Sequence, residues 1–293
     1  MQIVTDSGAD IYLPPEQRDE LDINVVPLVI TLDGKSYREG VDIQPNEFYK
    51  LLAETESLPT TSQPSAGDFA ETYRRLASTD PEILSIHMSS GLSGTFASAQ
   101  AGAEMVPEAN VTLVDTKTLS AASGWQVIAA AQAMKAGLMK EQILAMMKRI
   151  SDACDSMFTL KELKYLIHGG RISHMKGLIA SILNIKPIIG VEKTYGKYVQ
   201  LGQARSFIGA IKGLTNLMIK QHTAGSAIRI QVLHSNNEDG AAILCEQVRQ
   251  LFNCTLMPIG QLSLVLGAHT GPSMVGIAYA PISVFDDMHT AKT

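Results

Sequence analysis

The chain of 293 residues is 45% hydrophobic and 18% charged, which supplies a large apolar core and excludes a disordered or fibrous protein. Its formal net charge is −5 and it has no basic run, so a nucleic-acid partner held through phosphate contacts is excluded. Three cysteines in no zinc or disulfide pattern, no signal peptide and no apolar stretch of about 20 residues predict a soluble, cytoplasmic protein with reduced thiols.

Strand and helix patterns alternate through the first half of the chain. Strands are predicted at 3–4, 25–32, 83–88 and 111–114. Helices are predicted at 45–53, 121–136 and 140–153. A further helix is expected to begin at Ser65, where Asp68 completes a capping box, and another to follow the glycine-rich segment 89–95. The polar segment 60–64 is expected to be a loop. This alternation is typical of a parallel sheet covered by helices.

The pattern changes near residue 156, where we place the boundary between two α/β lobes. Helices are predicted at 160–168, 206–221 and 241–252, and strands at 228–233, 255–259 and 275–279. Segment 185–191 contains Pro187, which predicts an edge strand or an interrupted one. The expected division is 1–155, 156–280 and a tail at 281–293, with the strand near 274–280 left free to return to the first lobe.

Loops rich in Ser, Thr and Gly follow several predicted strands. The carboxyl ends of parallel strands meet at one rim, so residues 6–7, 89–95 and 115–116 are expected there, with 60–62 able to face it. A helix starting near Ser93 offers free N–H groups, and the Ser93 and Thr95 hydroxyls add donors, which favours an anion site. The alternatives are that Ser93 only caps the helix and that 60–62 is a solvated loop.

Familiar catalytic patterns are missing from these loops. The segment 91–95 resembles a nucleophile elbow, but Thr95 occupies the position where that motif needs glycine. No phosphate-binding loop, dinucleotide fingerprint or metal-binding histidine spacing occurs. We expect His87, inside a strand, to be structural, whereas His269, in a turn, is a better functional candidate. Arg171, after two glycines, is predicted either to form a salt bridge or to contact an anion.

Six segments in order resemble one known family. They are Thr-Asp-Ser-Gly-Ala-Asp (5–10), Pro-Thr-Thr-Ser-Gln-Pro-Ser (59–65), Ser-Ser-Gly-Leu-Ser-Gly-Thr (89–95), 163–173 with Gly-Gly-Arg-Ile-Ser at its end, Ile-Lys-Pro (185–187) and His-Thr-Gly-Pro (269–272). Each segment is weak evidence alone, but together they span about Gln2 to Tyr279. On these motifs the chain resembles the DegV family of bacterial fatty-acid-binding proteins.

The resemblance implies two α/β lobes of DegV type, a mostly parallel sheet in the first lobe, and an acyl tunnel between or beside the lobes. It assigns the carboxylate to Thr61 and Ser93, with His269 near the carboxylate end. The neighbouring residues of this site are Ser62, Gly94 and Thr95. Ser273 replaces the glycine that usually follows Gly-Pro in the family, which puts the role of His269 in question.

The resemblance also implies a function. The chain is expected to bind a long-chain fatty acid such as palmitate, without a cofactor, and to present it to a separate ATP-dependent kinase that makes an acyl phosphate. Arg205 and Arg171 are expected either to contact the kinase or to lie behind the residues that hold the carboxylate. Transient contact with a membrane surface fits this role in fatty acid metabolism. The alternatives are a stand-alone acyl hydrolase using Ser93 and His269, or a lipid-sensing regulator.

Overall fold

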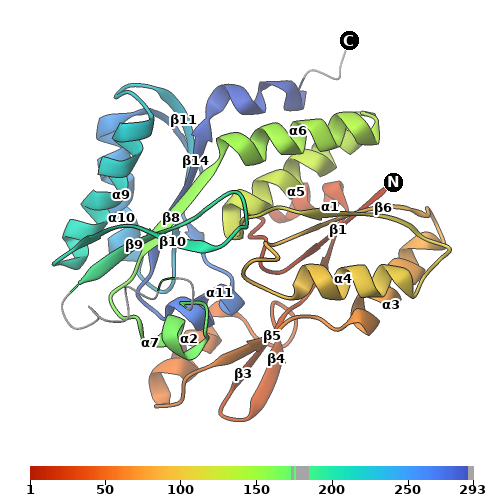
Figure 1. The fold of residues 1–293 in the computed structure, drawn as a ribbon, viewed down its shortest axis with the longest axis horizontal. Coiled ribbons are helices and arrows are strands. Elements are labelled where there is room, and N and C mark those ends of the chain that lie inside the picture. The colour runs from red at the N-terminus through yellow and green to blue at the C-terminus, as the bar shows by residue number, and fades with distance from the viewer. Residues whose placement is uncertain (173–174, 176–184, 290–293) are drawn as a thin grey trace.

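The computed structural model describes residues 1–172, 175 and 185–289, and shows a mixed α/β protein (Figure 1). Over these residues the backbone forms three sheets, called here sheet A, sheet D and the small sheet. Ser173, which closes one of the family-like segments, and the last residues of the expected tail, 290–293, lie outside the described residues.

Sheet A is parallel, as the sequence predicts, with the strand order β2-β1-β6-β7. Its strands are β1 (Gln2–Asp6), β2 (Ile23–Val26), β6 (Glu82–His87) and β7 (Asn110–Asp115). Helices α3 (Ala66–Ala77) and α4 (Thr95–Glu104) pack on one face around Val4 and Ile83. The chain leaves β1 toward β2 on one side and later passes from β6 to β7 on the other. The switch point of the sheet, where ligands bind in such folds, therefore lies between β1 and β6.

Sheet D forms the second half of the molecule, with the order β10-β9-β8-β14-β11-β12 and β13 beside β11. Its strands are β8 (Asp155–Thr159), β9 (Lys186–Val191), β10 (Tyr198–Ala204), β11 (Ala227–His234), β12 (Asn253–Leu256), β13 (Gly260–Gln261) and β14 (Val275–Pro281). Helices α9 (Phe207–Gln221) and α10 (Glu238–Leu251) pack against it. The final strand β14 pairs with β8 and β11, and so lies in this sheet rather than in sheet A.

The prediction of an edge or interrupted strand at 185–191 is wrong, because β9 has partners on both sides. Proline is tolerated here for a local reason. Pro187 pairs with Gln203 of β10, whereas the pairing with β8 begins only at Ile188. Its missing N–H therefore falls beyond the end of β8.

Two helices, α5 (Ser120–Lys135) and α6 (Lys140–Ala153), lie between sheet A and sheet D (Figure 1). Helix α5 is buried on nearly all sides, and its Gly124 packs so closely on the Asp10 carbonyl that a Cβ would collide with it. A helix that is apolar all round is one enclosed by the core. One core cluster accordingly joins Ile3 and Leu84 of sheet A to Ala278 of sheet D. The 3-10 helix η1 (Ile282–His289) covers α5 and α6.

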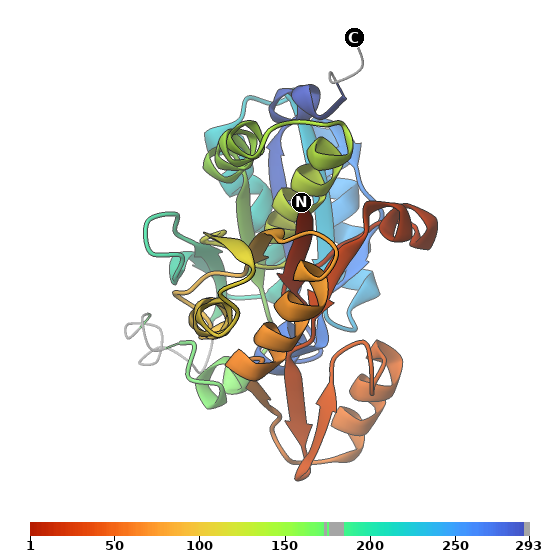
Figure 2. The same ribbon diagram turned by 90° about the vertical axis from the view of Figure 1, so that its right-hand side faces the viewer.

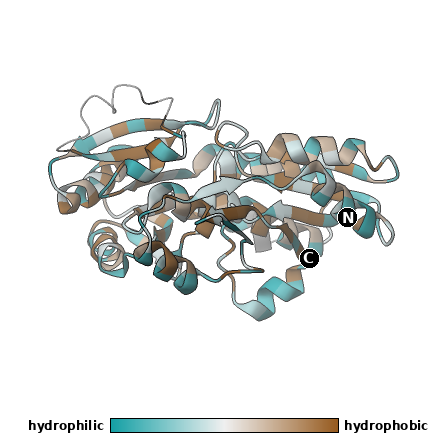
Figure 3. Cartoon of the chain, turned by 90° about the horizontal axis from the view of Figure 1, so that it is seen from below, coloured by the Kyte–Doolittle hydropathy of each residue, from teal (hydrophilic) through white to brown (hydrophobic). Residues whose placement is uncertain are grey.

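A small antiparallel sheet, β4-β3-β5, projects below the two large sheets (Figure 2). It contains β3 (Val29–Leu32), β4 (Lys35–Arg38) and β5 (Thr60–Ser62), and the nearby helices are α2 (Pro45–Glu54), α7 (Lys164–His168) and α11 (Leu264–Thr270). A short helix α1 (Pro15–Leu21) connects β1 to β2. The apolar side chains of this region belong to one buried cluster, and the hydropathy colouring of Figure 3 shows the brown strands inside and teal helix faces outside.

Three sequence predictions in this region need correction. The run 25–32 is not one strand, because the chain breaks after Val26 at Pro27 and continues as β3 in another sheet. The segment 60–64 is not only a loop, since Thr60, Thr61 and Ser62 pair with β3. The helix expected at 160–168 is shorter, and only Lys164–His168 is helical.

Candidate functional site

Two side chains from distant parts of the chain meet below the switch point of sheet A. The Thr61 Oγ1 of β5 and the His269 Nε2 of α11 are 2.7 Å apart and hydrogen-bonded. His269 lies in the last turn of α11 and not in a turn segment, which corrects the sequence prediction. Gly169 faces the other side of its ring, where a Cβ would overlap His269 Nδ1. Glycine is therefore required at 169 for the imidazole to sit where it does.

The His269 imidazole is neutral near pH 7. The side chain is 7% exposed. Burial, with the nearby positive charge of Arg171 and His168, lowers the pKa of His269 to about 4. Its Nδ1 is buried and makes no hydrogen bond to any described residue. A neutral ring offers one donor and one acceptor, and Thr61 uses the Nε2 side.

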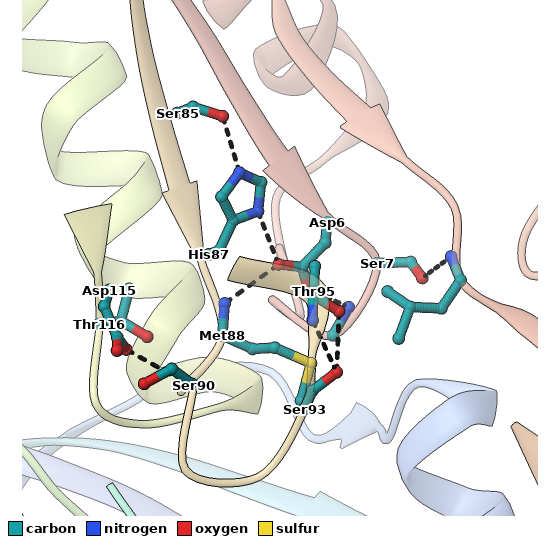
Figure 4. A network of polar contacts seen from close by, with 12 residues as sticks. Asp6, Ser7, Ser85, His87, Met88, Ser90, Ser93, Thr95, Asp115 and Thr116 are labelled. Carbon is teal, nitrogen blue, oxygen red and sulfur yellow. Dashed lines mark hydrogen bonds and ion pairs between the residues drawn. The ribbon is translucent and has the colours of Figure 1, made fainter. Parts of the chain in front are cut away.

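The loop after β6 brings Ser93 to the same region. Ser93 Oγ accepts from the Thr95 N–H at 3.2 Å and lies 2.8 Å from Thr95 Oγ1 (Figure 4). The N-cap of α4 is Gly94, and Ser93, one residue before it, satisfies the N–H of Thr95, the first residue of the helix. Gly94 touches the end of the Gln63 side chain, which would have to move to admit a Cβ. The segments 60–63 and 93–95 therefore lie against each other.

Thr61, Ser93, Arg171 and His269 line one pocket, which we call the polar pocket. Arg171 is half-buried there. Its Nη1 donates to the Gly169 carbonyl at 2.6 Å and its Nε donates to the Leu92 carbonyl at 3.4 Å. These bonds join the second half of the chain to the loop that carries Ser93. The sequence-predicted residues Thr61, Ser93, Arg171 and His269 are thus brought together.

An apolar pocket adjoins the polar one, and the two share Tyr198 and Leu266. Its other lining side chains include Leu119, Phe158, Met274 and Ile277. The cavities are narrow, about 20 Å³ in the polar pocket and about 30 Å³ in the apolar one. Each has room for about one or two water molecules. Together they form a polar end that continues into an apolar interior.

Other sequence-predicted residues lie elsewhere. Side chains alternate along a strand, and Ser62 is exposed where its neighbour Thr61 faces His269. Thr95 is fully buried behind Ser93. Arg205 is exposed between β10 and α9 and does not line either pocket. Ser273, the departure from the family pattern, accepts the Lys161 N–H at 3.1 Å on its Oγ and lines neither pocket.

Sequence reasoning missed a buried polar chain at the switch point (Figure 4). Tyr73 OH bonds to Ser85 Oγ at 2.7 Å, Ser85 Oγ to His87 Nε2 at 2.7 Å, and His87 Nδ1 to Asp6 Oδ2 at 2.9 Å. Asp6 also accepts the N–H of Met88 at 3.0 Å. The set contains Ser, His and Asp, but all are 0% exposed, so no substrate reaches them. This series of hydrogen bonds fixes the loops after β1 and β6, and His87 is structural as predicted.

The geometry does not support the hydrolase alternative. Ser93 bonds to Thr95 and His269 bonds to Thr61, so the two do not form a nucleophile–base pair. Across the described ranges, no acidic side chain orients His269 and no set of three His, Cys, Asp or Glu side chains is placed to bind a metal ion. None of the helices described is both long and apolar enough to cross a membrane.

Comparisons with known proteins agree on one family. Residues 1–281 match the family described as "Uncharacterised protein, DegV family". A DegV domain-containing protein of Listeria monocytogenes is 32% identical over 279 residues, which cover 95% of this chain and 97% of that relative. A structure entitled "Fatty Acid Binding of a DegV family Protein from Thermus thermophilus" has a TM-score of 0.84 and 32% identity, covering 96% and 99% of the two chains.

The DegV protein of Bacillus subtilis, described as a fatty acid binding protein, has a TM-score of 0.83 and 30% identity, covering 95% of this chain and 98% of that one. The family match extends over all three sheets described above and every loop that carries a candidate residue. This chain belongs to the DegV family.

Proposed function

We propose that this protein binds one long-chain fatty acid, with the carboxylate in the polar pocket and the acyl chain in the apolar pocket. The observation that carries the proposal is the junction of the two pockets at Tyr198 and Leu266. A ligand with one polar end and a long apolar body matches this arrangement. Relatives of 30% and 32% identity that are described as fatty-acid-binding support it.

Hydroxyl groups would hold the carboxylate. If the neutral His269 donates its Nε2–H to Thr61 Oγ1, the Thr61 O–H is left free to donate to the acid. Ser93 offers a second hydroxyl, and Arg171 supplies positive charge at the edge of the pocket. A buried carboxylate is costly unless such donors satisfy it. The site therefore favours an anion without enclosing it in fixed charges.

Burial of the acyl chain would supply most of the affinity. At about 0.8 kcal/mol per methylene, a chain of about 16 carbons gains roughly 12 kcal/mol before the costs of ordering and lost translation. The narrow cavities require side chains to move aside as the chain enters. Met88 and Met274 line the two pockets, and methionine adapts its shape readily.

The finer role that we propose is that of a carrier. The protein would present its bound acid to a separate ATP-dependent kinase, which forms the acyl phosphate, with transient contact at a membrane surface during loading. Arg205 is exposed at the start of α9, outside both pockets, and so is available to a partner protein. A lipid-sensing regulator is the alternative, and adding the kinase with ATP separates the two: acyl phosphate forms only with a carrier.

Native mass spectrometry of the purified protein, followed by lipid extraction, tests the binding function directly. One fatty acid per chain is expected, released on denaturation. Protein that carries no lipid, and takes up none when mixed with palmitate or oleate, would show that the pockets do not hold an acyl chain. Hydrolysis of an acyl ester that is lost in Ser93→Ala would instead favour the hydrolase.

A further inference from the structure

A third cavity lies at the carboxyl ends of β1 and β2, apart from the two pockets assigned to the fatty acid. Its volume is about 370 Å³, within the range of about 300–1,000 Å³ that is usual for small-molecule sites. It shares no lining residue with the polar or the apolar pocket. Its chemistry is therefore separate from that of the acyl site.

Two carboxyl groups, Asp10 and Glu39, line this acidic cavity. Asp10 is 8% exposed; its Oδ1 accepts the Ser263 N–H at 2.9 Å, and the Ser120 hydroxyl donates to its Oδ2. Glu39 Oε1 accepts the N–H of Leu264. Both side chains are thus held in fixed positions beside the start of α11.

The carboxyl groups of Asp10 and Glu39 have no charged partner among the described residues, so burial favours their protonated forms. Neither carboxyl is ion-paired with a Lys, Arg or His of the described ranges. Arg18, the basic residue in the lining, donates instead to the Ile11 carbonyl at 3.1 Å. Burial raises the pKa of Asp10 to about 7 and that of Glu39 to about 8, and Asp10 adds to the rise at Glu39 while the Ser7 hydroxyl opposes it.

Two oxygen atoms in the cavity lining also lack partners. Glu39 Oε2 and Ser263 Oγ are buried and make no hydrogen bond of good geometry to any residue that the structure describes, although the Ser7 hydroxyl is close enough to Glu39 to lower its pKa. A buried polar atom left unpaired costs free energy, which a bound donor would recover once the side chain turns toward the cavity. The same donor, if positively charged, would also favour the ionised forms of the two acids, which burial disfavours. Both defects call for the same kind of ligand, a hydrogen-bonding cation.

The rim of the cavity adds an apolar requirement. Val25 is 45% exposed and Val41 is 58% exposed, and both line the cavity with Pro27. A metal ion would make no use of this rim, and two carboxyls without a third ligand do not form a metal site. We propose that the acidic cavity binds a small organic cation, a guanidinium or ammonium group on a short alkyl chain. The charged group lies on Glu39 and Asp10, and the alkyl part lies against Val25 and Val41.

Butylguanidinium is the probe for this site, because its charge is constant over the pH range in which the two acids titrate. The full-length protein, labelled with ¹⁵N, is titrated with it while the amide signals of Gly40, Val41 and Gln261 are followed. Saturable shifts of these signals are expected. 1-Butanol, which has the same alkyl part without the charge, should give none. Equal shifts with both compounds, or none with either, would overturn the proposal.

Glu39→Gln tests the role of the charge, because the amide keeps a carbonyl oxygen that can accept the Leu264 N–H. The affinity for butylguanidinium should fall about tenfold or more. Glu71→Gln, on the exposed side of α3, is the matched control and should leave it unchanged. Asp10→Asn provides a second variant should Glu39→Gln not fold, and wild-type affinity in the folded variant contradicts the site. Palmitate binding is measured on the same variants, so that failure at the acyl site is seen separately.

Discussion

Thr61 and His269 are 208 positions apart in the chain, yet their side chains share a hydrogen bond of 2.7 Å. Thr61 comes from the small sheet and His269 from the helix that precedes the last strand of sheet D. The pair exists only when both halves of the molecule are in place. The proposed carboxylate site therefore depends on how the halves are docked, and substitutions that disturb the docking should weaken binding even where they touch no ligand.

Removal of the Thr61 hydroxyl should weaken fatty acid binding. Thr61→Ala deletes the proposed carboxylate donor and leaves His269 Nε2 without its partner, so a loss of roughly 1–3 kcal/mol is expected. Competition with a fluorescent fatty acid measures it. Thr60→Ala is the control, because Thr60 is the same residue type, on the same strand, but exposed. Equal affinity of wild type and Thr61→Ala would remove Thr61 from the site.

A methyl group at Gly169 should disturb the site without changing any ligand contact. In Gly169→Ala the new Cβ overlaps the His269 ring, which must move away from Thr61. We expect weaker palmitate binding and a lower melting temperature. Gly67→Ala, where the nearest atom to the added Cβ is Ser65 Oγ at 3.5 Å, serves as the matched control with neither effect. A Gly169→Ala protein that binds like wild type would show that the position of His269 is unimportant.

His269 should make the protein less stable as the pH falls. Its folded pKa of about 4 lies below the ordinary histidine value of 6.5, so the unfolded chain takes up the proton first. The stabilisation is complete above about pH 6.5 and is lost as the pH falls toward 4, on the order of 3 kcal/mol. Urea unfolding of wild type and His269→Gln across this interval measures it.

The comparison of the two proteins isolates His269 from other titrating groups. Asp10 and Glu39 have raised pKa values, so they make the unfolding free energy fall as the pH rises, which is the opposite of the effect of His269. Both proteins contain these two acids, so their contribution cancels in the difference between the two unfolding free energies. The difference in unfolding free energy should shrink as the pH falls. A difference that stays constant with pH would mean that His269 is not held neutral by burial.

Arg205 should matter for the kinase step alone. Because its side chain is exposed and outside both pockets, Arg205→Ala is expected to bind palmitate normally but to give about tenfold less acyl phosphate with the kinase and ATP. Arg249→Ala, exposed on α10, is the control for loss of a surface charge. Full acyl phosphate formation by Arg205→Ala would place the docking surface elsewhere.

Local patterns predicted much of the fold. The alternation of strands and helices gave the parallel sheet A, and Ser65 with Asp68 forms the capping box that the sequence indicates. Such features are readable because a helix period or a cap is fixed by residues a few positions apart. Glycine at 169 and 94 also stood out in the sequence, although the side chains they make room for did not.

Predictions failed where distant residues decide the outcome. The run 25–32 has the composition of one strand, but the Leu28 N–H donates to Ser7 Oγ at 3.0 Å and the chain changes sheets there. β5 is three polar residues that form a strand only because β3 pairs with it. Pro187 is inside a sheet because β8 ends before reaching it.

The sequence by itself determined the layered α/β class, the order of the family motifs and the residue types of the polar pocket, because these are properties of short segments. Only the tertiary structure decided that Thr61 meets His269, that Ser62 and Arg205 stand outside the pockets, and that Asp10 and Glu39 share a cavity. Those contacts arise from long-range packing of the sheets around α5, and packing depends on shape and burial that no local pattern records.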